Sequence, residues 1–319
     1  MARQFNYIIT IHNKEKLIER VLMAILMCAR DNSHVYPVLD GCTDGTEKII
    51  DEIIGAYSDV PITKVFAPNV HELLSINAGL RKADQSGDGF NIVLQDDVLL
   101  ADFLLEKKIA ALYDWAGPQL GYVSLRFGAN FSQDAATSDS HIPLFQFAEN
   151  AYAYYNPDSQ MLMPGQFTYR QVPIKSPVCF PFKLVREIGV LEEKLAPFAH
   201  DDFEYAIRCL KAGYRNGVFA VRFRSDLDWG GTRQGGHIPV SPMIKRNIGR
   251  IREWHGADLA KVAEKGESTE VFEIVGLAET ARKHALMAQE ATYAALHRHH
   301  NWRSRSLAKL RSIKSIFTG

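Results

Sequence analysis

The alternation of short β-rich runs with helical patterns constrains the fold of this chain more than any other feature. Candidate strands lie at 5–11, 34–39, 62–66, 90–95 and 121–127. After the first of them, apolar residues recur at helical spacing: Leu17, Ile18, Val21, Leu22, Ile25 and Leu26. Strands that alternate with helices are typical of βαβ units. Residues 1–127 are therefore predicted to form an α/β unit with a mainly parallel sheet flanked by helices.

Several helix starts carry candidate caps. Asn13 is expected to cap the first helix, and Asp44 and Glu47 have the spacing of a capping box at the start of the second. Further helices are predicted over 70–84, 101–115 and 201–213, with a strand at 217–224 and mostly helical sequence from there to the end. Between them, 128–178 is rich in aromatic residues, Asn, Gln and Pro. Its aromatic rings would either stack on sugar rings in an acceptor cleft or seal the core.

Composition excludes some classes of protein. The 37 Lys and Arg residues balance the 37 Asp and Glu residues, so no global field favours nucleic acid. The four cysteines, which show no metal-ligand spacing, favour reduced thiols. The first strand begins close to Met1, which leaves no room for a leader, and the apolar run at 21–29 is shorter than the ~20 residues of a membrane span. A cytoplasmic protein is expected.

Three acidic clusters are the candidate chemistry of the chain. Asp96 and Asp97 follow the buried-type run at 90–94, while Asp40 to Asp44 and Asp201-Asp202 also lie where a strand ends or a helix begins. Burying an ionised carboxylate is costly unless a cation or several donors compensate. In an open α/β sheet the carboxyl ends of the strands are where ligands bind. A cation-dependent site at that edge is therefore expected.

The order of five motifs resembles family 2 glycosyltransferases of the GT-A fold. The motifs are Ile8-Ile9-Thr10-Ile11-His12-Asn13, Asp40-Gly41-Cys42-Thr43-Asp44-Gly45-Thr46, Asn77-Ala78-Gly79-Leu80, Gln95-Asp96-Asp97, and Asp201-Asp202 followed by Lys211-Ala212-Gly213-Tyr214. The resemblance extends over about residues 5–232. It implies a GT-A type, Rossmann-like mainly parallel sheet and transfer of a sugar from a nucleotide diphosphate to an acceptor hydroxyl. Gln95 departs from the family's D-x-D pattern, which has Asp at that position.

The resemblance also implies roles for individual residues. Thr10, His12, Asp40, Asn77 and Asp96 would bind the nucleotide, with the Asp40 carboxylate accepting from a uracil N–H and the His12 ring stacking on the base. A UDP-sugar is the favoured donor.

The same resemblance implies the metal ligands and the base. Asp97 would hold Mg²⁺ or Mn²⁺ on the diphosphate, with Asp228 as the candidate third ligand and His237 as the second choice. Asp202 would take the proton from the acceptor hydroxyl, giving a single inverting displacement. From residue types alone, Asp201 and Asp202 could instead cap a helix, or one could cap while the other serves in catalysis.

The chain divides by these patterns into 1–127, which would bind the nucleotide sugar, 128–240, which would bind the acceptor and carry the base, and 241–319, a helical extension. After Glu290 only basic charges occur, beside apolar residues. Such a tail suits an amphipathic helix on an anionic membrane surface, or a helix that packs on the catalytic domain or on a second subunit of a homo-oligomer. The acceptor would be a carbohydrate or a lipid-linked molecule, as in polysaccharide biosynthesis, with no nucleic acid partner.

Two other functions fit part of the sequence. A sugar-phosphate nucleotidyltransferase also needs an α/β sheet and metal-binding carboxylates, but 11–16 lacks the Gly-rich basic loop expected after the first strand. A non-catalytic carbohydrate-binding protein of the same fold would be favoured by Gln95, whereas Asp97 and Asp202 favour an enzyme.

Overall fold

The computed structural model describes residues 3–30, 32–57, 59–131, 145–150, 162–225, 240–264 and 270–275. Its helices are α1 Ile18–Cys28, α2 Thr46–Ala56, α3 His71–Lys82, α4 Leu105–Ala116, α5 Phe182–Ile188, the 3-10 helix η1 Glu193–Leu195, α6 Asp201–Lys211 and α7 Val240–Glu264. Its strands are β1 Gln4–Ile11, β2 Ser33–Asp40, β3 Val65–Ala67, β4 Gly89–Gln95, β5 Leu99–Leu100, β6 Leu120–Ser124, β7 Phe127–Phe131, β8 Phe145–Asn150, β9 Gln166–Tyr169, β10 Val172–Ile174, β11 Val178–Pro181, β12 Arg215–Phe219, β13 Phe223–Arg224 and β14 Phe272–Glu273.

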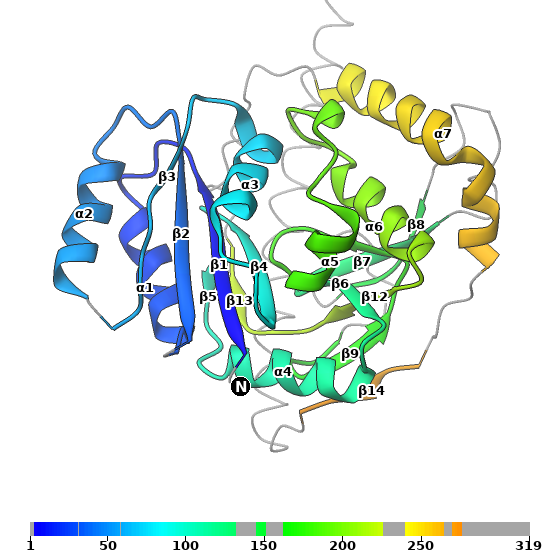
Figure 1. The fold of residues 1–319 in the computed structure, drawn as a ribbon, viewed down its shortest axis with the longest axis horizontal. Coiled ribbons are helices and arrows are strands. Elements are labelled where there is room, and N and C mark those ends of the chain that lie inside the picture. Colours follow the sequence, from blue (N-terminus) through cyan, green and yellow to red (C-terminus); the bar gives the residue numbers. More distant parts are fainter. Residues whose placement is uncertain are drawn as a thin grey trace, which may run out of the picture.

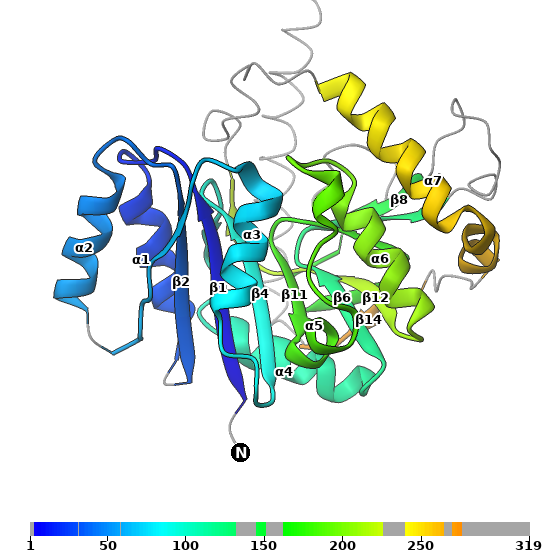
Figure 2. The ribbon, with the colours of Figure 1, turned by 45° about the horizontal axis from the view of Figure 1, so that its top comes forward.

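A nine-stranded mixed sheet forms the centre of the molecule, in the order β14-β9-β12-β6-β11-β4-β1-β2-β3. β9 and β11 run against the other seven strands, as the pairings of their neighbours show. Figure 2 shows β2, β1, β4, β11 and β6 side by side in that order. The mainly parallel α/β sheet expected from the sequence is therefore confirmed.

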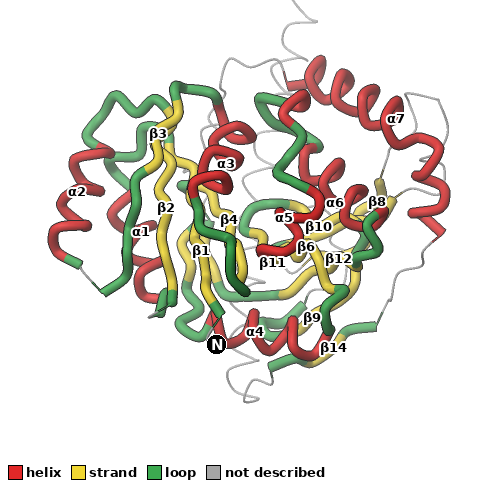
Figure 3. Tube along the Cα trace, viewed as in Figure 1, coloured by secondary structure: helices red, strands yellow, loops and turns green. Residues whose placement is uncertain are grey.

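Helices cover both faces of this sheet (Figures 1 and 3). Successive residues of β1 point to opposite faces, as the period of two in a strand requires. Tyr7 and Ile9 pack with the apolar residues of α1, α2 and α4, whereas Ile8 packs with those of α3 and α6. α3 lies very close to the sheet, since a Cβ on Gly79 would come within 2.4 Å of Ile8 Cγ2. Glycine is thus required at this position of the Asn77-Ala78-Gly79-Leu80 motif.

The region expected to form one strand at 121–127 is instead two strands in different sheets. The Ser124 hydroxyl accepts hydrogen bonds from the backbone N–H groups of Arg126 (3.1 Å) and Phe127 (3.0 Å), and it donates to the Ile174 carbonyl. These bonds turn the chain between β6 and β7, and β7 joins a three-stranded sheet with β10 and β8. The strand expected at 217–224 is likewise divided into β12 and β13, and the strand expected at 62–66 is the shorter β3.

The two expected caps are also corrected. Leu17 is the residue that precedes α1, and the Asn13 side chain accepts from the Thr43 backbone N–H instead of capping that helix. Asp44 accepts from the Thr46 N–H at the start of α2, but Glu47 forms an ion pair with Lys64 rather than completing a capping box.

Part of the aromatic segment at 128–178 can be placed. Phe167 of β9 is fully buried in the core, which agrees at this position with the core-sealing interpretation of 128–178. Residues 132–144, 151–161 and the basic tail lie outside the described residues. Among the residues that are described, no helix is long and apolar enough to cross a membrane.

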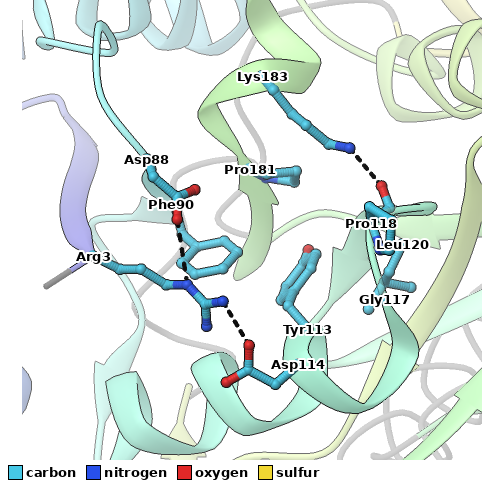
Figure 4. Close-up of a pocket in the computed structure, with 10 residues that line it drawn as sticks. All are labelled: Arg3, Asp88, Phe90, Tyr113, Asp114, Gly117, Pro118, Leu120, Pro181 and Lys183. Carbon is cyan, nitrogen blue, oxygen red and sulfur yellow. Dashed lines mark hydrogen bonds and ion pairs between the residues drawn. The ribbon is translucent and has the colours of Figure 1, made fainter. Parts of the chain in front are cut away.

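A pocket of about 350 Å³ lies at the edge of the sheet where β4 and β6 begin (Figure 4). Arg3 crosses one side of it and forms ion pairs with Asp88 and Asp114. Both carboxylates beside Arg3 are therefore engaged. The predicted site residues Thr10, His12, Asp40, Asp96 and Asp97 lie at the opposite edge, where β1, β2 and β4 end.

Candidate active site

The carboxyl ends of β4, β1 and β2 bring three predicted site segments together. These strands are parallel neighbours in register, with Thr10 of β1 opposite both Gln95 of β4 and Val38 of β2. The residues that follow the strands consequently meet at one edge of the sheet, including Asp40 at the end of β2 and Asp96-Asp97 after β4. This edge is where ligands bind in open α/β sheets.

His12 connects two of the acidic clusters. Its Nδ1 lies 2.6 Å from the Asp40 carbonyl oxygen, and its backbone N–H donates to Asp96 Oδ2 at 3.0 Å. Nδ1 therefore carries the proton in this contact, which fixes the ring although the residue is exposed to solvent. An exposed, oriented imidazole at this edge is suited to stacking on a flat base.

The Asp40 carboxylate is buried and held by the loop before α3. Its two oxygens accept from the backbone N–H groups of Val70 and His71, each at 2.7 Å. Each carboxylate oxygen has more than one lone pair, so the group keeps capacity to accept a further hydrogen bond. The loop thus fixes the orientation of the predicted base-recognition residue.

Asp96 and Asp97 lie in the turn that follows β4 and are both largely buried. Burial raises the pKa of Asp96 to about 6, against the opposing effects of the Lys14 ammonium, 3.5 Å away, and the His12 N–H. An acid with this pKa gains from a nearby cation, which would favour its ionised form.

These two carboxylates suit part of a Mg²⁺ or Mn²⁺ site, because hard divalent cations prefer oxygen ligands. Within the described ranges, no group of three His, Cys, Asp or Glu side chains is arranged to hold a metal. Phosphate oxygens of a bound nucleotide would supply further oxygen ligands. The predicted third ligands Asp228 and His237 lie outside the described residues.

Asp201 and Asp202 are the first two residues of α6 and are buried. Neither is the helix cap that their position suggested: the residue before the helix is His200, and the Asp201 carboxylate forms an ion pair with Lys175. Asp202 Oδ1 accepts from the Phe203 N–H at 3.0 Å. Burial and the neighbouring charge of Asp201 raise the pKa of Asp202 to about 7.

A buried polar chain connects Asp201 to the end of β4, and sequence reasoning missed it. Gln95 Nε2 donates to Glu72 Oε1 at 2.7 Å, Glu72 lies 3.1 Å from Lys175 Nζ, and Lys175 pairs with Asp201. The interacting residues come from α3, β4, the segment after β10, and α6. No short-range spacing could have found them, since Glu72 resembles an acid at the start of an exposed helix and Lys175 lies in the irregular segment.

Asn77 is corrected from nucleotide ligand to structural residue. Its side chain is fully buried, its Nδ2 donates to the Leu191 carbonyl at 2.8 Å, and its Oδ1 accepts from the Leu191 N–H at 3.0 Å. A further contact with Glu193 Oε1 uses the other donor of the amide. The N-x-G-L motif therefore fixes α3 to the chain before η1.

The family model described as "Glycosyltransferase like family 2" matches residues 2–262. The chain belongs to glycosyltransferase family 2. It is accordingly a glycosyltransferase, and the match favours this enzyme over the nucleotidyltransferase and the non-catalytic binding protein. No curated protein sequence matches the chain.

The GT-A fold of this glycosyltransferase is shared with one solved structure, S. aureus TarS 1-349. S. aureus TarS 1-349 in complex with UDP-GlcNAc has a TM-score of 0.52 and 14% identity, covering 82% of this chain and 71% of that one. A longer S. aureus TarS structure has a TM-score of 0.46 and 15% identity; the match covers 69% of this chain but only 35% of that one. The mannosyltransferase PcManGT from Pyrobaculum calidifontis, solved with GDP-Man and Mn²⁺, has a TM-score of 0.47 and 18% identity over 95% of this chain and 84% of that one.

Proposed function

We propose that this glycosyltransferase moves a sugar from a nucleoside diphosphate sugar to an acceptor hydroxyl with inversion at the anomeric carbon, using Asp202 as the base. The observation that carries the proposal is the placement of a buried carboxyl with a pKa of about 7 at the start of α6, joined by the Gln95-Glu72-Lys175-Asp201 chain to the strand end that bears Asp96 and Asp97. A general base is most effective when its pKa is near the working pH.

Different residues at the sheet edge would bind different parts of the donor. The exposed His12 ring would stack on the base, and the fixed Asp40 carboxylate would accept from a base N–H, which favours uracil. Asp97, with Asp96 beside it, would hold Mg²⁺ or Mn²⁺. The bound cation would neutralise charge on the departing diphosphate.

Asp202 would accept the proton of the acceptor hydroxyl as that oxygen attacks the sugar. A base on the face opposite the leaving diphosphate gives one displacement and hence inversion. The acceptor is proposed to be a carbohydrate or a lipid-linked molecule, and segment 128–240 its binding region. A cytoplasmic location and a homo-oligomer or membrane contact through the basic tail remain part of the proposal.

The test uses UDP-GlcNAc, the sugar nucleotide in the S. aureus TarS complex, with Mn²⁺. Release of UDP, as the sugar is transferred to water or to an acceptor, is expected to fall by about a hundredfold or more in Asp202→Asn. The variant should still bind the donor, measured as a Mn²⁺-dependent rise in melting temperature. The matched control is Asp258→Asn, which changes an acid of α7 that pairs with Lys211, and it should turn over like the unmodified enzyme.

Turnover that persists in Asp202→Asn would contradict the assignment of the base. If UDP-GlcNAc gives neither binding nor turnover, the same two measurements are repeated with other UDP-sugars and with GDP-mannose. Absence of turnover with every donor would contradict the proposed reaction. The anomeric configuration of the product, read by proton NMR, tests inversion separately.

A further inference from the structure

Lys175 is a buried lysine between two helices of the candidate active site. Its Nζ lies 3.1 Å from Glu72 Oε1 of α3 and also pairs with Asp201 Oδ2 of α6, and its side chain is only 8% exposed. Lysine is rarely buried to this extent without charged partners. Burial by itself would lower the pKa of Lys175, but Asp201 and Glu72 outweigh it and raise that pKa. The ammonium is therefore charged over the whole working range of pH.

The same residue contacts both acids at the start of α6. Its ammonium pairs with Asp201, while its backbone nitrogen lies 3.4 Å from Asp202 Oδ2. Asp201 is fully buried, and its Oδ1 has no hydrogen-bond partner among the described residues. The compensation of the Asp201 charge consequently depends on Lys175.

The charges that face Asp202 come from several elements. Asp201, on the same helix, and Glu72, on α3, raise the pKa of Asp202, while Lys175, after β10, lowers it. Tyr122 of β6 also interacts with Asp202 but stays protonated, because burial raises its own pKa far above neutrality. One ammonium in this group thus offsets a set of three carboxylates.

We propose that Lys175 is a positioning residue of the transfer site: its ammonium neutralises Asp201 and ties α6 to α3, which keeps Asp202 in place as the proton acceptor. The inference rests on the proposed function of Asp202, and it adds a residue outside the motifs of the sequence. Gln95 takes part because its amide donates to Glu72. An amide at position 95 supplies this donor without adding another negative charge to the group.

Opposite shifts in two variants provide the test. Lys175→Met removes the only positive charge named above, so the titration midpoint of Asp202 should rise by about one pH unit or more. Glu72→Gln removes a negative charge and keeps an oxygen that can accept from Gln95, so the midpoint should fall. Lys175→Arg keeps the charge and should restore the midpoint to near its original value. Lost packing alone would not produce shifts of opposite sign.

The primary readout is the carbon-13 signal of the Asp202 carboxyl group, identified by its absence in Asp202→Asn and followed from pH 5 to 9. It needs no donor or acceptor, so it can fail independently of the proposed reaction. The acid limb of the rate of UDP release from UDP-GlcNAc with Mn²⁺ should move with the NMR midpoint. Lys108→Met is the matched control: Lys108 is also buried and paired with an acid, Asp102, and its loss should leave the Asp202 midpoint unchanged.

An unchanged Asp202 midpoint in Lys175→Met would overturn the proposal, as would a shift of the same size in Lys108→Met. If Lys175→Met does not fold, Glu72→Gln still decides, because Lys175 then has Asp201 as its remaining carboxylate partner. A midpoint that stays the same or rises in Glu72→Gln overturns the proposal.

Discussion

Replacing Asp202 with Asn is expected to stabilise the protein above neutral pH while it removes transfer activity. Burial, together with the charge of Asp201, raises the pKa of Asp202 from 3.8 to about 7. Between these values the folded state holds a proton that the unfolded state has lost. Stability therefore falls as the pH rises through this window. Asn cannot ionise, so the Asp202→Asn variant does not lose stability in this way as the pH rises.

The size of the effect follows from the width of the window. Each pH unit over which one proton separates the two states changes the free energy of unfolding by about 1.4 kcal/mol. From pH 5 to pH 7 the unmodified protein loses about 2 kcal/mol of stability, because Asp202 is already half ionised at pH 7, and the loss approaches about 3 kcal/mol by pH 8. The Asn side-chain oxygen can still accept from the Phe203 N–H, which Asp202 Oδ1 accepts at 3.0 Å. The free energy of unfolding of Asp202→Asn, relative to that of the unmodified protein, should thus rise by about 3 kcal/mol between pH 5 and pH 8.

Urea unfolding at pH 5, 6, 7 and 8 measures this difference. Asp258→Asn is the control with the opposite sign, because a hydrogen bond from Lys211 lowers the pKa of Asp258. That exposed variant should show no gain in stability with rising pH. A difference between Asp202→Asn and the unmodified protein that does not change with pH would refute the reasoning, and so would a loss of stability in Asp202→Asn at pH 8.

Three further variants test other parts of the structure. Asp97→Asn should weaken Mn²⁺-dependent binding of UDP about tenfold or more, measured by calorimetry, whereas binding of UDP without metal should change little. Gly79→Ala should destabilise the protein by about 1–3 kcal/mol in urea unfolding, because its Cβ would lie 2.4 Å from Ile8 Cγ2; Gly55→Ala, which meets nothing within 4 Å in α2, should be neutral or stabilising. Glu204→Gln should lower the free energy of unfolding by about 3 kcal/mol in the same assay, because Arg208 of α6 and His255 of α7 would lose their buried carboxylate partner. An unchanged urea midpoint would show that these ion pairs contribute nothing to stability.

The parallel core of the fold could be predicted because its signal is local. β1, β2 and β4 are mostly apolar runs buried on both faces, which is the pattern of central parallel strands. The split between β6 and β7 could not be predicted, because it depends on the Ser124 hydroxyl, which accepts hydrogen bonds from two nearby backbone N–H groups and donates one to a carbonyl of a distant strand. Apolar periodicity continues through that corner and gives no sign of it.

The candidate site was predictable where a motif and a strand end coincide. Asp40 and Asp96 were expected at one edge, and the contacts of His12 with both join them there. Asn77 was assigned wrongly because a motif does not state whether its polar side chain faces a ligand or the interior. The structure shows this amide hydrogen-bonded to Leu191, before η1, and to Glu193, the first residue of η1.

The sequence by itself determined the α/β class, the family resemblance and the positions of the acidic clusters, since each depends on residue type and short spacing. Only the tertiary structure decided how the charges of Asp96 and Asp202 are compensated. Lys175 balances Asp201 across helices that are distant in sequence, and the pKa of a buried acid depends on charges and burial in three dimensions. The physical reason is that electrostatic interactions act through space, whereas sequence motifs record only order along the chain.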